Sequence, residues 1–343
     1  MDKQIVLKAT DTVKRAVELI DKKRIRAVFI VDEDEKLLGI FTQGDLRKYI
    51  LKNGRIDGTI AEAMNRDPKV FKNIEEAREG IIVAPIVDQY GRLIDVLNNG
   101  QEETNDIKKN VCLRDVPLVI MAGGMGTRLY PLTKILPKAL IPIGEYTIIE
   151  RIINNFVAWG CRDVYVVINY KGDMIRTYLE DKAKEYRIHF VQEEEFLGTG
   201  GGLALLKGRI NSTFILSNCD ILVETDFECV LKTHRKRKYD ITFIGAYMNM
   251  QIPYGVIQTD EEGDITELTE KPEISFLTNA GVYVIEPEIV DSMPMNTFCH
   301  MTDLAMNCMQ NGKKVGVFPV SSNAWQDMGQ IDEMKSMIKT FEK

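Results

Sequence analysis

The sequence is poor in the residues on which many catalytic and metal sites depend. Only three histidines occur in 343 residues, His189, His234 and His300, and none lies in a recognisable nucleophile motif. The cysteines form no CxxC pair and match no zinc-binding spacing. We therefore expect neither Ser-His nor Cys-His chemistry, and we interpret the cysteines as buried reduced thiols. The six cysteines are Cys112, Cys161, Cys219, Cys229, Cys299 and Cys308.

Long apolar segments are also missing. No apolar run approaches the length of a membrane span. The first residues, Met1-Asp2-Lys3-Gln4, lack the basic region that leads into an apolar one in a secretory signal. We therefore expect a cytoplasmic protein with no membrane partner.

An excess of positive charge is absent as well. Residues 1–110 carry 20 basic and 20 acidic side chains and residues 111–343 carry 24 and 31, so the totals are 44 and 51 and the net charge is −7. A nucleic-acid platform needs a basic stripe, so no nucleic-acid partner is expected. The acidic excess is typical of a solvated surface, and it is compatible with carboxylates that hold metal ions.

A glycine-rich segment follows the apolar run Leu118–Ala122. It is neither GxGxxG with an acidic residue at dinucleotide spacing nor GxxxxGK[ST]. Glycine permits positive φ angles and close approach of a ligand, and successive backbone N–H groups can form an anion site. Arg128 and Lys138 add full positive charges nearby. The alternative is a purely structural turn, but the pattern favours a nucleoside triphosphate site formed by Ala122, Gly123, Gly124, Gly126 and Thr127.

From Pro117 onward, apolar runs with strand and helix character alternate. This alternation predicts an α/β domain with a doubly wound, mostly parallel sheet, whose ligands bind beyond the carboxyl ends of the strands. Gly123–Arg128 and Asp220 lie at such ends. The polar residues 98–116 are the expected linker. The expected strands are 118–122, 164–168, 189–192 and 214–217, and the expected helices are 148–159 and 174–185.

Residues 1–110 contain two similar units, which resemble a tandem pair of CBS domains with bounds 1–55 and 56–110. The segment from Gly39 to Asp45 fits the CBS pattern Gly-x-x-[Ser/Thr]-x-x-[Asp/Asn]. The resemblance implies that Thr42 contacts a nucleotide phosphate and Asp45 a ribose, forming a regulatory nucleotide site. The alternative is that both residues only cap a helix. In the second unit Asn98 and Gln101 stand at the corresponding places, so a second half-site is doubtful.

Residues 117–343 resemble the sugar-phosphate nucleotidyltransferases, which implies a Rossmann-like (GT-A-like) domain with a mostly parallel mixed sheet. The resemblance is carried by six motifs in the order of that family. They are GGMGTRLYPLT with PKAL (123–133, 137–140), LGTGGG (197–202), SNCD (217–220), YGVI (254–257), EKP (270–272) with NAGVY (279–283), and WQDMG (325–329).

This resemblance implies transfer of a nucleotidyl group from a nucleoside triphosphate to a sugar 1-phosphate, with release of pyrophosphate. The attacking phosphate oxygen is already anionic, so no histidine base is needed. The remaining tasks are to align two polyanions and to neutralise their charge. Mg²⁺ suits this purpose because it is bound by one or two carboxylates together with substrate phosphates.

The resemblance also implies a role for individual residues. Asp220 and Asp327 would hold Mg²⁺, and Arg128, Lys138 and Lys271 would complete the catalytic set. Gln192, with Glu193 beside it, would read the base. Gly198 and Thr199 would contact the base and ribose, and the sugar contacts would be Gly255, Glu270, Lys271 and Asn279.

The LGTGG loop resembles that of guanylyltransferases. A CBS pair ahead of such a domain resembles the glucosamine-1-phosphate guanylyltransferases of bacterial legionaminic acid biosynthesis. We therefore expect GTP and glucosamine 1-phosphate as substrates, with mannose or heptose 1-phosphate as the alternative. We also expect a homo-oligomer formed through the CBS domains. A non-catalytic nucleotide sensor is the alternative of another class.

Overall fold

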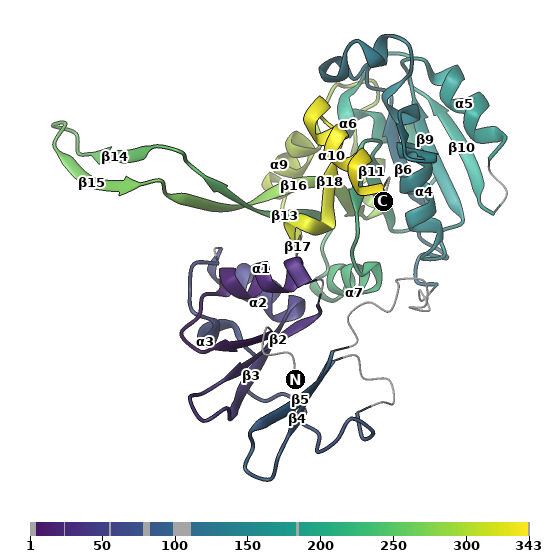
Figure 1. The fold of residues 1–343 in the computed structure, drawn as a ribbon. Helices are drawn as coiled ribbons and strands as arrows, with labels where there is room; N and C mark the ends of the chain where they lie inside the picture. The colour runs from purple at the N-terminus through teal and green to yellow at the C-terminus, as the bar shows by residue number, and fades with distance from the viewer. Residues whose placement is uncertain are drawn as a thin grey trace. The chain divides into compact units, whose positions relative to one another are not determined.

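The computed structural model describes residues 5–23, 25–54, 56–77, 83–98, 111–182 and 185–341. The chain divides into two units. The larger unit comprises Lys108–Tyr247 and Leu277–Lys343, and the smaller unit comprises Met1–Ile107 and Met248–Phe276. Each unit is described by itself (Figure 1).

The larger unit is built on a seven-stranded mixed sheet with strand order β10-β9-β6-β11-β16-β13-β17. The pairs β10–β9, β9–β6, β6–β11 and β13–β17 are parallel, whereas β16 is antiparallel to β11. The expected α/β fold with a mostly parallel mixed sheet is confirmed. The strands are β6 (Leu118–Ala122), β9 (Asp163–Ile168), β10 (Arg187–Gln192), β11 (Phe214–Asn218), β13 (Ile241–Gln251), β16 (Glu273–Ile285) and β17 (Val315–Val320).

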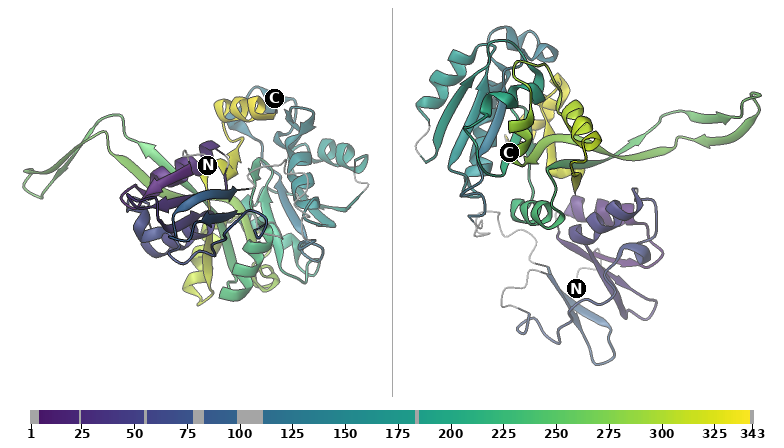
Figure 2. Two further views of the ribbon diagram at one scale, coloured as in Figure 1. Left: turned by 60° about the horizontal axis from the view of Figure 1, so that its bottom comes forward. Right: turned by 180° about the vertical axis from the view of Figure 1, so that it is seen from behind.

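Helices cover both faces of this sheet (Figure 2). Alternate residues of β6 face opposite sides. Leu118 and Ile120 join the core formed with α4, α5, α7 and α10, whereas Val119 and Met121 join the core formed with α8 and α9. The larger unit therefore forms three layers, helix–sheet–helix. The helices are α4 (Ile148–Val157), α5 (Gly172–Glu180), α7 (Phe227–Arg237), α8 (Pro287–Ser292), α9 (Met301–Gln310) and α10 (Ile331–Phe341).

Short elements occupy the connections of the larger unit. The helix predicted to start after Thr147 does so, because the Thr147 side chain accepts from Glu150 N and the Glu150 carboxylate accepts from Thr147 N. The short elements are η2 (Thr127–Leu129), η3 (Leu132–Lys134), η4 (Lys138–Leu140), β7 (Pro142–Ile143), β8 (Tyr146–Thr147), α6 (Gly198–Gly201), η5 (Gly202–Leu206), β12 (Ile221–Val223), η6 (Ser322–Ala324) and β18 (Trp325–Asp327).

The N-terminal part of the smaller unit contains two β-hairpins, β2–β3 and β4–β5, and the division into two CBS domains at 1–55 and 56–110 stays a prediction. Its two hairpin turns pair with each other through Leu37 N to Gly91 O at 3.0 Å and Leu93 N to Glu35 O at 2.9 Å. β1, β2 and β3 form one sheet and β4 and β5 another. The elements are β1 (Val6–Lys8), α1 (Val13–Lys23), β2 (Ala27–Val31), β3 (Leu37–Thr42), α2 (Gln43–Asn53), α3 (Ile60–Ala63), β4 (Val83–Val87) and β5 (Leu93–Asn98).

The second part of the smaller unit is one antiparallel hairpin of β14 (Gly255–Thr259) and β15 (Ile265–Glu270) (Figure 1). The predicted linker lies for the most part outside the described residues, as does Gln101. Among the helices that the structure describes, none has the length and apolar character needed to cross a membrane.

Candidate functional site

The glycine-rich turn begins where β6 ends. Of its three glycines only Gly126 has a positive φ angle, +64°, so the conformational requirement falls on that residue. At Gly123 the constraint is space, because a Cβ atom there would lie 2.6 Å from Glu193 Oε2. At Gly124 a Cβ atom would meet nothing within 4 Å. Gly124 therefore presents bare backbone to an open side of the turn, as the anion-site prediction requires.

Glu193 brings a buried carboxylate to this turn. Its side chain is 2 % exposed, and burial raises the pKa of its carboxyl above the usual range. Oε1 accepts from Leu197 N at 2.9 Å, and Asn169 Nδ2 donates to the Glu193 carbonyl at 2.8 Å. Gln192 is exposed and donates to the Glu193 carbonyl at 3.3 Å. Of these two residues, Glu193 is the one whose side chain reaches the glycine-rich turn.

Asp220 and Asp327 are brought together by the pairing of β12 with β18. Ile221 lies opposite Asp327 in this antiparallel pair, and Met328 N donates to Asp220 O at 3.0 Å. The Lys138 ammonium forms an ion pair with the Asp220 carboxylate, and both side chains are largely buried. Three of the predicted catalytic residues therefore meet in one cluster.

The two carboxylates of this cluster differ in their surroundings, since Asp220 is paired with Lys138 and Asp327 is not. Burial, followed by the charges of Asp220 and Glu333, raises the pKa of Asp327 to about 6 even though Lys138 opposes the shift. Asp327 Oδ1 is buried and accepts no hydrogen bond from the described residues. A buried carboxylate oxygen without a donor, next to a second carboxylate, fits a hard divalent cation such as Mg²⁺. No cluster of three or more His, Cys, Asp or Glu side chains is arranged for a metal in the described part of the chain.

Three further polar groups near these carboxylates were not identified from the sequence. Asn218 Oδ1, Gln326 Oε1 and Glu333 Oε2 are buried acceptor atoms that have no hydrogen-bond partner within the described ranges. Asn218 and Gln326 each lie within two residues of a predicted metal ligand, which is the only sequence signal that they gave. Glu333 lies in the first turn of α10 and gave none.

Arg128 differs from Lys138 in its surroundings. It lies in η2 directly after the glycine-rich turn, and its side chain is exposed. In the part of the chain that the structure describes, it forms no ion pair. Arg128 is therefore a cation at the turn that no carboxylate of the described residues neutralises, whereas Lys138 is already paired with Asp220.

The glycines of residues 198–202 have a packing role. A Cβ atom at Gly198 would lie 2.7 Å from Cys299 O, and one at Gly201 would lie 2.3 Å from Thr297 O. The N–H groups of Gly200 and Gly201 donate to Cys299 O at 2.9 and 3.0 Å. This run is glycine-rich because another backbone segment lies against it. Contact of Gly198 and Thr199 with a nucleotide stays a prediction.

The predicted sugar contacts fall into two groups. Tyr254 O accepts from Lys271 N at 3.2 Å and Gly255 pairs with Glu270, so these four residues meet at one end of the β14–β15 hairpin. The side chains of Glu270 and Lys271 are 76 % and 58 % exposed. Asn279 belongs to the larger unit, where its Oδ1 accepts from Gly281 N at 3.0 Å and its Nδ2 donates to Tyr283 Oη at 2.8 Å.

Thr42 and Asp45 form the helix cap that was the alternative interpretation of their motif. Asp45 Oδ2 accepts from Thr42 N at 3.1 Å and from Thr42 Oγ1 at 2.6 Å, and Oδ1 lies 3.3 Å from Lys48 Nζ. Asp45 is 8 % exposed. Both oxygens of the predicted ribose ligand are thus engaged within α2 and its cap, and the regulatory nucleotide site stays a prediction.

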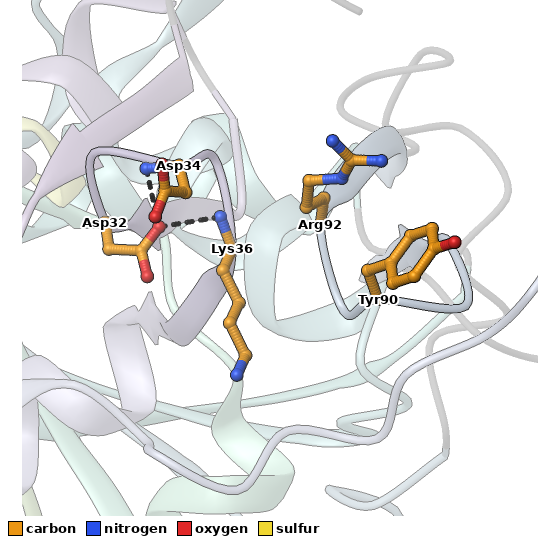
Figure 3. A pocket seen from close by; sticks show the side chains of 5 residues that line it. All are labelled: Asp32, Asp34, Lys36, Tyr90 and Arg92. Carbon is orange, nitrogen blue, oxygen red and sulfur yellow. Dashed lines mark hydrogen bonds between the residues drawn. The ribbon is translucent and has the colours of Figure 1, made fainter.

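A pocket of about 340 Å³ lies in the smaller unit between the two paired hairpin turns (Figure 3). Asp32 Oδ1 accepts from the N–H groups of Asp34 and Lys36 at 3.0 and 2.8 Å. Arg92 binds Asp88 in the other turn at 2.9 Å. The polar groups of this pocket therefore chiefly hold the turns, and no residue predicted for the site lines it. Its lining is completed by Tyr90.

Comparison with known proteins assigns both parts of the chain. A family model described as nucleotidyl transferase matches residues 118–343, and a CBS domain model matches residues 1–52. The chain is similar to a mannose-1-phosphate guanylyltransferase of Mycobacterium tuberculosis, with 30 % identity over 223 residues that cover 64 % of this chain and 62 % of the relative. It is also similar to the bifunctional protein GlmU of Methanococcus aeolicus, with 33 % identity over 50 % of this chain and 41 % of that protein. The chain thus spans less than two thirds of the length of these relatives.

Solved structures share the fold of the larger unit. The crystal structure of HddC from Yersinia pseudotuberculosis matches with a TM-score of 0.53 and 23 % identity, over 66 % of this chain and 99 % of HddC. The same protein complexed with GMP-PN matches with a TM-score of 0.53 and 22 % identity. At this identity the likeness concerns the fold alone.

Proposed function

Since this chain belongs to the nucleotidyl transferase family, we propose that it transfers a nucleotidyl group from a nucleoside triphosphate to a sugar 1-phosphate. The observation that carries this proposal is the pairing of β12 with β18, which places Asp220 and Asp327 together beside Lys138. Mannose-1-phosphate guanylyltransferases and a GlmU protein are among its relatives, which supports the same reaction class.

The reaction needs charge neutralisation more than proton transfer. An oxygen of the sugar phosphate attacks the α-phosphorus of the triphosphate, the bond from that phosphorus to the bridging oxygen breaks, and pyrophosphate leaves with the bond electrons. The attacking oxygen carries no proton at neutral pH, so the site needs no base. Arg128, exposed and unpaired within the described ranges, supplies the cation for the triphosphate, and backbone N–H groups of the glycine-rich turn supply neutral donors.

We propose Mg²⁺ as the cofactor, with Asp220 and Asp327 as its ligands. The ion would neutralise phosphate charge near the α-phosphorus. The raised pKa of Asp327 and its unpartnered Oδ1 support this assignment, because a cation would offset the repulsion between the two carboxylates. The ion pair with Lys138 holds the Asp220 side chain in place.

We propose guanine as the base, on the chemistry of Glu193. The Watson–Crick edge of guanine offers two adjacent donors, N1–H and the N2 amino group, which a carboxylate accepts. Uracil and thymine offer a donor between two acceptors, which an amide matches better. Glu193 Oε2 faces Gly123, and Oε1 accepts from Leu197 N with one of its two lone pairs, so each oxygen keeps an acceptor position. The guanylyltransferases among the relatives support the same base.

For the sugar we propose glucosamine 1-phosphate, which would give GDP-glucosamine for legionaminic acid biosynthesis. The order of a CBS segment followed by the transferase domain supports this choice. The alternative is mannose or heptose 1-phosphate. Mannose 1-phosphate is the substrate in the names of several relatives.

Release of pyrophosphate with Mg²⁺ and a panel of triphosphates and sugar 1-phosphates tests the function. We expect turnover with GTP above that with UTP, ATP or dTTP, and with glucosamine 1-phosphate above mannose and heptose 1-phosphate. Absence of turnover with every pair would favour a non-catalytic sensor. Association through the CBS domains, a regulatory nucleotide at Thr42 and Asp45, and a cytoplasmic location stay predictions.

A further inference from the structure

Three lysines adopt the left-handed backbone conformation that usually favours glycine. They are Lys171 and Lys238, both with φ of +54°, and Lys271 with φ of +48°. This conformation is costly for a residue with a Cβ atom, and such residues collect at functional sites. Lys271 is already a predicted sugar-phosphate contact. Lys171, between β9 and α5, belongs to no motif of the proposed reaction.

The Lys171 side chain bridges to the loop that follows the glycine-rich turn. Its Nζ donates to Lys134 O at 2.6 Å and to Ile135 O at 2.7 Å. These carbonyls stand at the end of η3, where the final C=O groups of a helix lack partners within the helix. The lysine thus satisfies two acceptors that the loop cannot satisfy by itself.

Thr133, which lies in η3, connects this short helix to the glycine-rich turn. This residue is fully buried, and its Oγ1 donates to Gly126 O at 2.8 Å. A Cβ atom at Gly126 would lie 3.0 Å from Thr133 Cγ2 and 3.3 Å from Lys138 Cβ, so the turn packs directly on both residues. A shift of η3 would therefore move Gly126 and the segment that carries Arg128.

A second contact ties the same loop to the end of β9. Tyr170 N donates to Gly123 O at 3.4 Å, and Tyr170 Oη reaches Thr133 O at 3.5 Å. Both distances are long for hydrogen bonds, so the two short bonds of Lys171 are the main restraint from this side.

We propose that Lys171 is a positioning residue that holds the phosphate loop, residues 123–138, in the arrangement that receives the triphosphate. This inference rests on the proposed function. In this proposal the ammonium acts through the backbone carbonyls of Lys134 and Ile135, on which two of its three donors are used. The left-handed backbone at Lys171 is tolerated because it directs the side chain onto η3.

The test compares Lys171→Met with Lys171→Arg and with the control Lys238→Met. Lys238 has the same φ angle, but it ends α7 on an exposed surface. Met keeps the length of the side chain without a donor, whereas Arg keeps donors that can reach two carbonyls. Amide hydrogen exchange over residues 127–138 of the free protein reports the order of the loop, and circular dichroism reports the fold.

For Lys171→Met we expect about tenfold faster exchange in this loop and a KM for the triphosphate raised by a similar factor, because fewer molecules hold the competent loop. The KM for the sugar 1-phosphate should stay within about twofold, since the loop arrangement affects the triphosphate. Lys171→Arg should restore most of both properties, and Lys238→Met should alter neither.

Unchanged exchange in Lys171→Met would overturn the proposal. A raised KM without faster exchange would also overturn it, since Lys171 would then contact the triphosphate directly. The exchange measurement requires no turnover, so it stays informative if the wild-type protein proves inactive with every substrate pair. A failure of the proposed function is thereby distinguished from a failure of this inference.

Discussion

The backbone N–H of Met328 donates to the carbonyl oxygen of Asp220 at 3.0 Å. This bond extends the β12–β18 pair by one step beyond Ile221 and Asp327, so two distant segments are joined at the residues proposed to hold the metal. Asp327 lies in β18, and Asp220 lies in the turn just before β12, where its carbonyl is bonded to the segment that follows β18. The mutual repulsion of their carboxylates is therefore built into the fold, and a bound cation would relieve it.

Asp220→Asn and Asp327→Asn should each lower kcat by about 100-fold or more, because each removes a metal-ligand charge. Asp220→Asn should also lower the melting temperature, because it leaves the largely buried Lys138 ammonium without its counter-charge. Asp327→Asn should keep or raise the melting temperature without metal, since it removes a buried charge next to Asp220 and Glu333. Pyrophosphate release and thermal melts check both statements. Full activity in both variants would contradict the metal assignment.

Arg128→Ala should reduce kcat, or kcat/KM for the triphosphate, more than it changes affinity for the sugar phosphate. The guanidinium is exposed and finds no carboxylate among the described residues, so it is available to an anionic substrate. Removing one such cation should cost about 10²- to 10³-fold in turnover. Initial rates with each substrate varied in turn measure the split. The opposite pattern, with only the sugar KM raised, would place Arg128 at the sugar phosphate.

Glu193→Gln should lower kcat/KM for GTP by about 10- to 100-fold and reduce the preference for GTP over UTP or dTTP, because an amide offers only one acceptor to the guanine edge. Gln192→Ala is the matched control, since that side chain is exposed and directed to the Glu193 carbonyl. A loss of GTP preference in Gln192→Ala with none in Glu193→Gln would reassign base reading to Gln192.

Local patterns were sufficient to predict the layers of the larger unit. The run Leu118–Ala122 is apolar throughout, which is typical of a strand covered on both faces, and Thr147 with Glu150 is a capping pair. The pairing of Asp220 with Asp327 could be expected only from a family resemblance. No local sequence pattern relates these two residues, because they are far apart in the sequence and meet only where β12 pairs with β18.

Other features depend on contacts that composition does not encode. The sequence predicts ligand contacts for Gly198 and Thr199, but the glycines of 198–202 also admit the backbone of residues 297–299. Gln192 and Glu193 are equivalent candidates for base reading in the sequence. The structure distinguishes them, because at the end of β10 Glu193 is buried and Gln192 is exposed. Lys171 gave no signal because its partners are carbonyl oxygens, which every residue possesses.

Stability of the larger unit should fall as the pH drops below about 6.5, in part through His234. This imidazole is fully buried between Thr242 Oγ1 at 2.7 Å and Glu286 Oε1 at 2.9 Å. Burial lowers the pKa of His234 from its ordinary value of 6.5, although Glu286 opposes the shift. The unfolded chain therefore binds the proton more readily, so this stability is present above pH 6.5 and is lost as the pH falls toward the lowered pKa.

His234→Gln should remove this acid-sensitive component and cost about 1–3 kcal/mol at neutral pH, because a buried partner loses its hydrogen bond. His300→Gln, at the exposed start of α9, is the control. Urea unfolding of the wild type and the two variants between pH 5 and about 8 isolates the contribution of His234 to the pH dependence of stability. Parallel pH profiles for wild type and His234→Gln would contradict the assignment.

Gly123→Ala and Gly124→Ala separate the structural role of the glycine-rich turn from its role toward a ligand. At Gly123 a methyl group would lie 2.6 Å from Glu193 Oε2, so the carboxylate must shift, and stability should fall by about 1–3 kcal/mol.

At Gly124 the methyl group meets nothing within 4 Å and φ is not positive, so the fold should be unaffected. If the triphosphate lies on this bare backbone, Gly124→Ala should still raise its KM about tenfold or more, since the methyl group occupies the space of a phosphate. Thermal melts together with triphosphate titrations measure both effects. An unchanged KM in Gly124→Ala would show that the triphosphate binds elsewhere, and the turn would then be structural only.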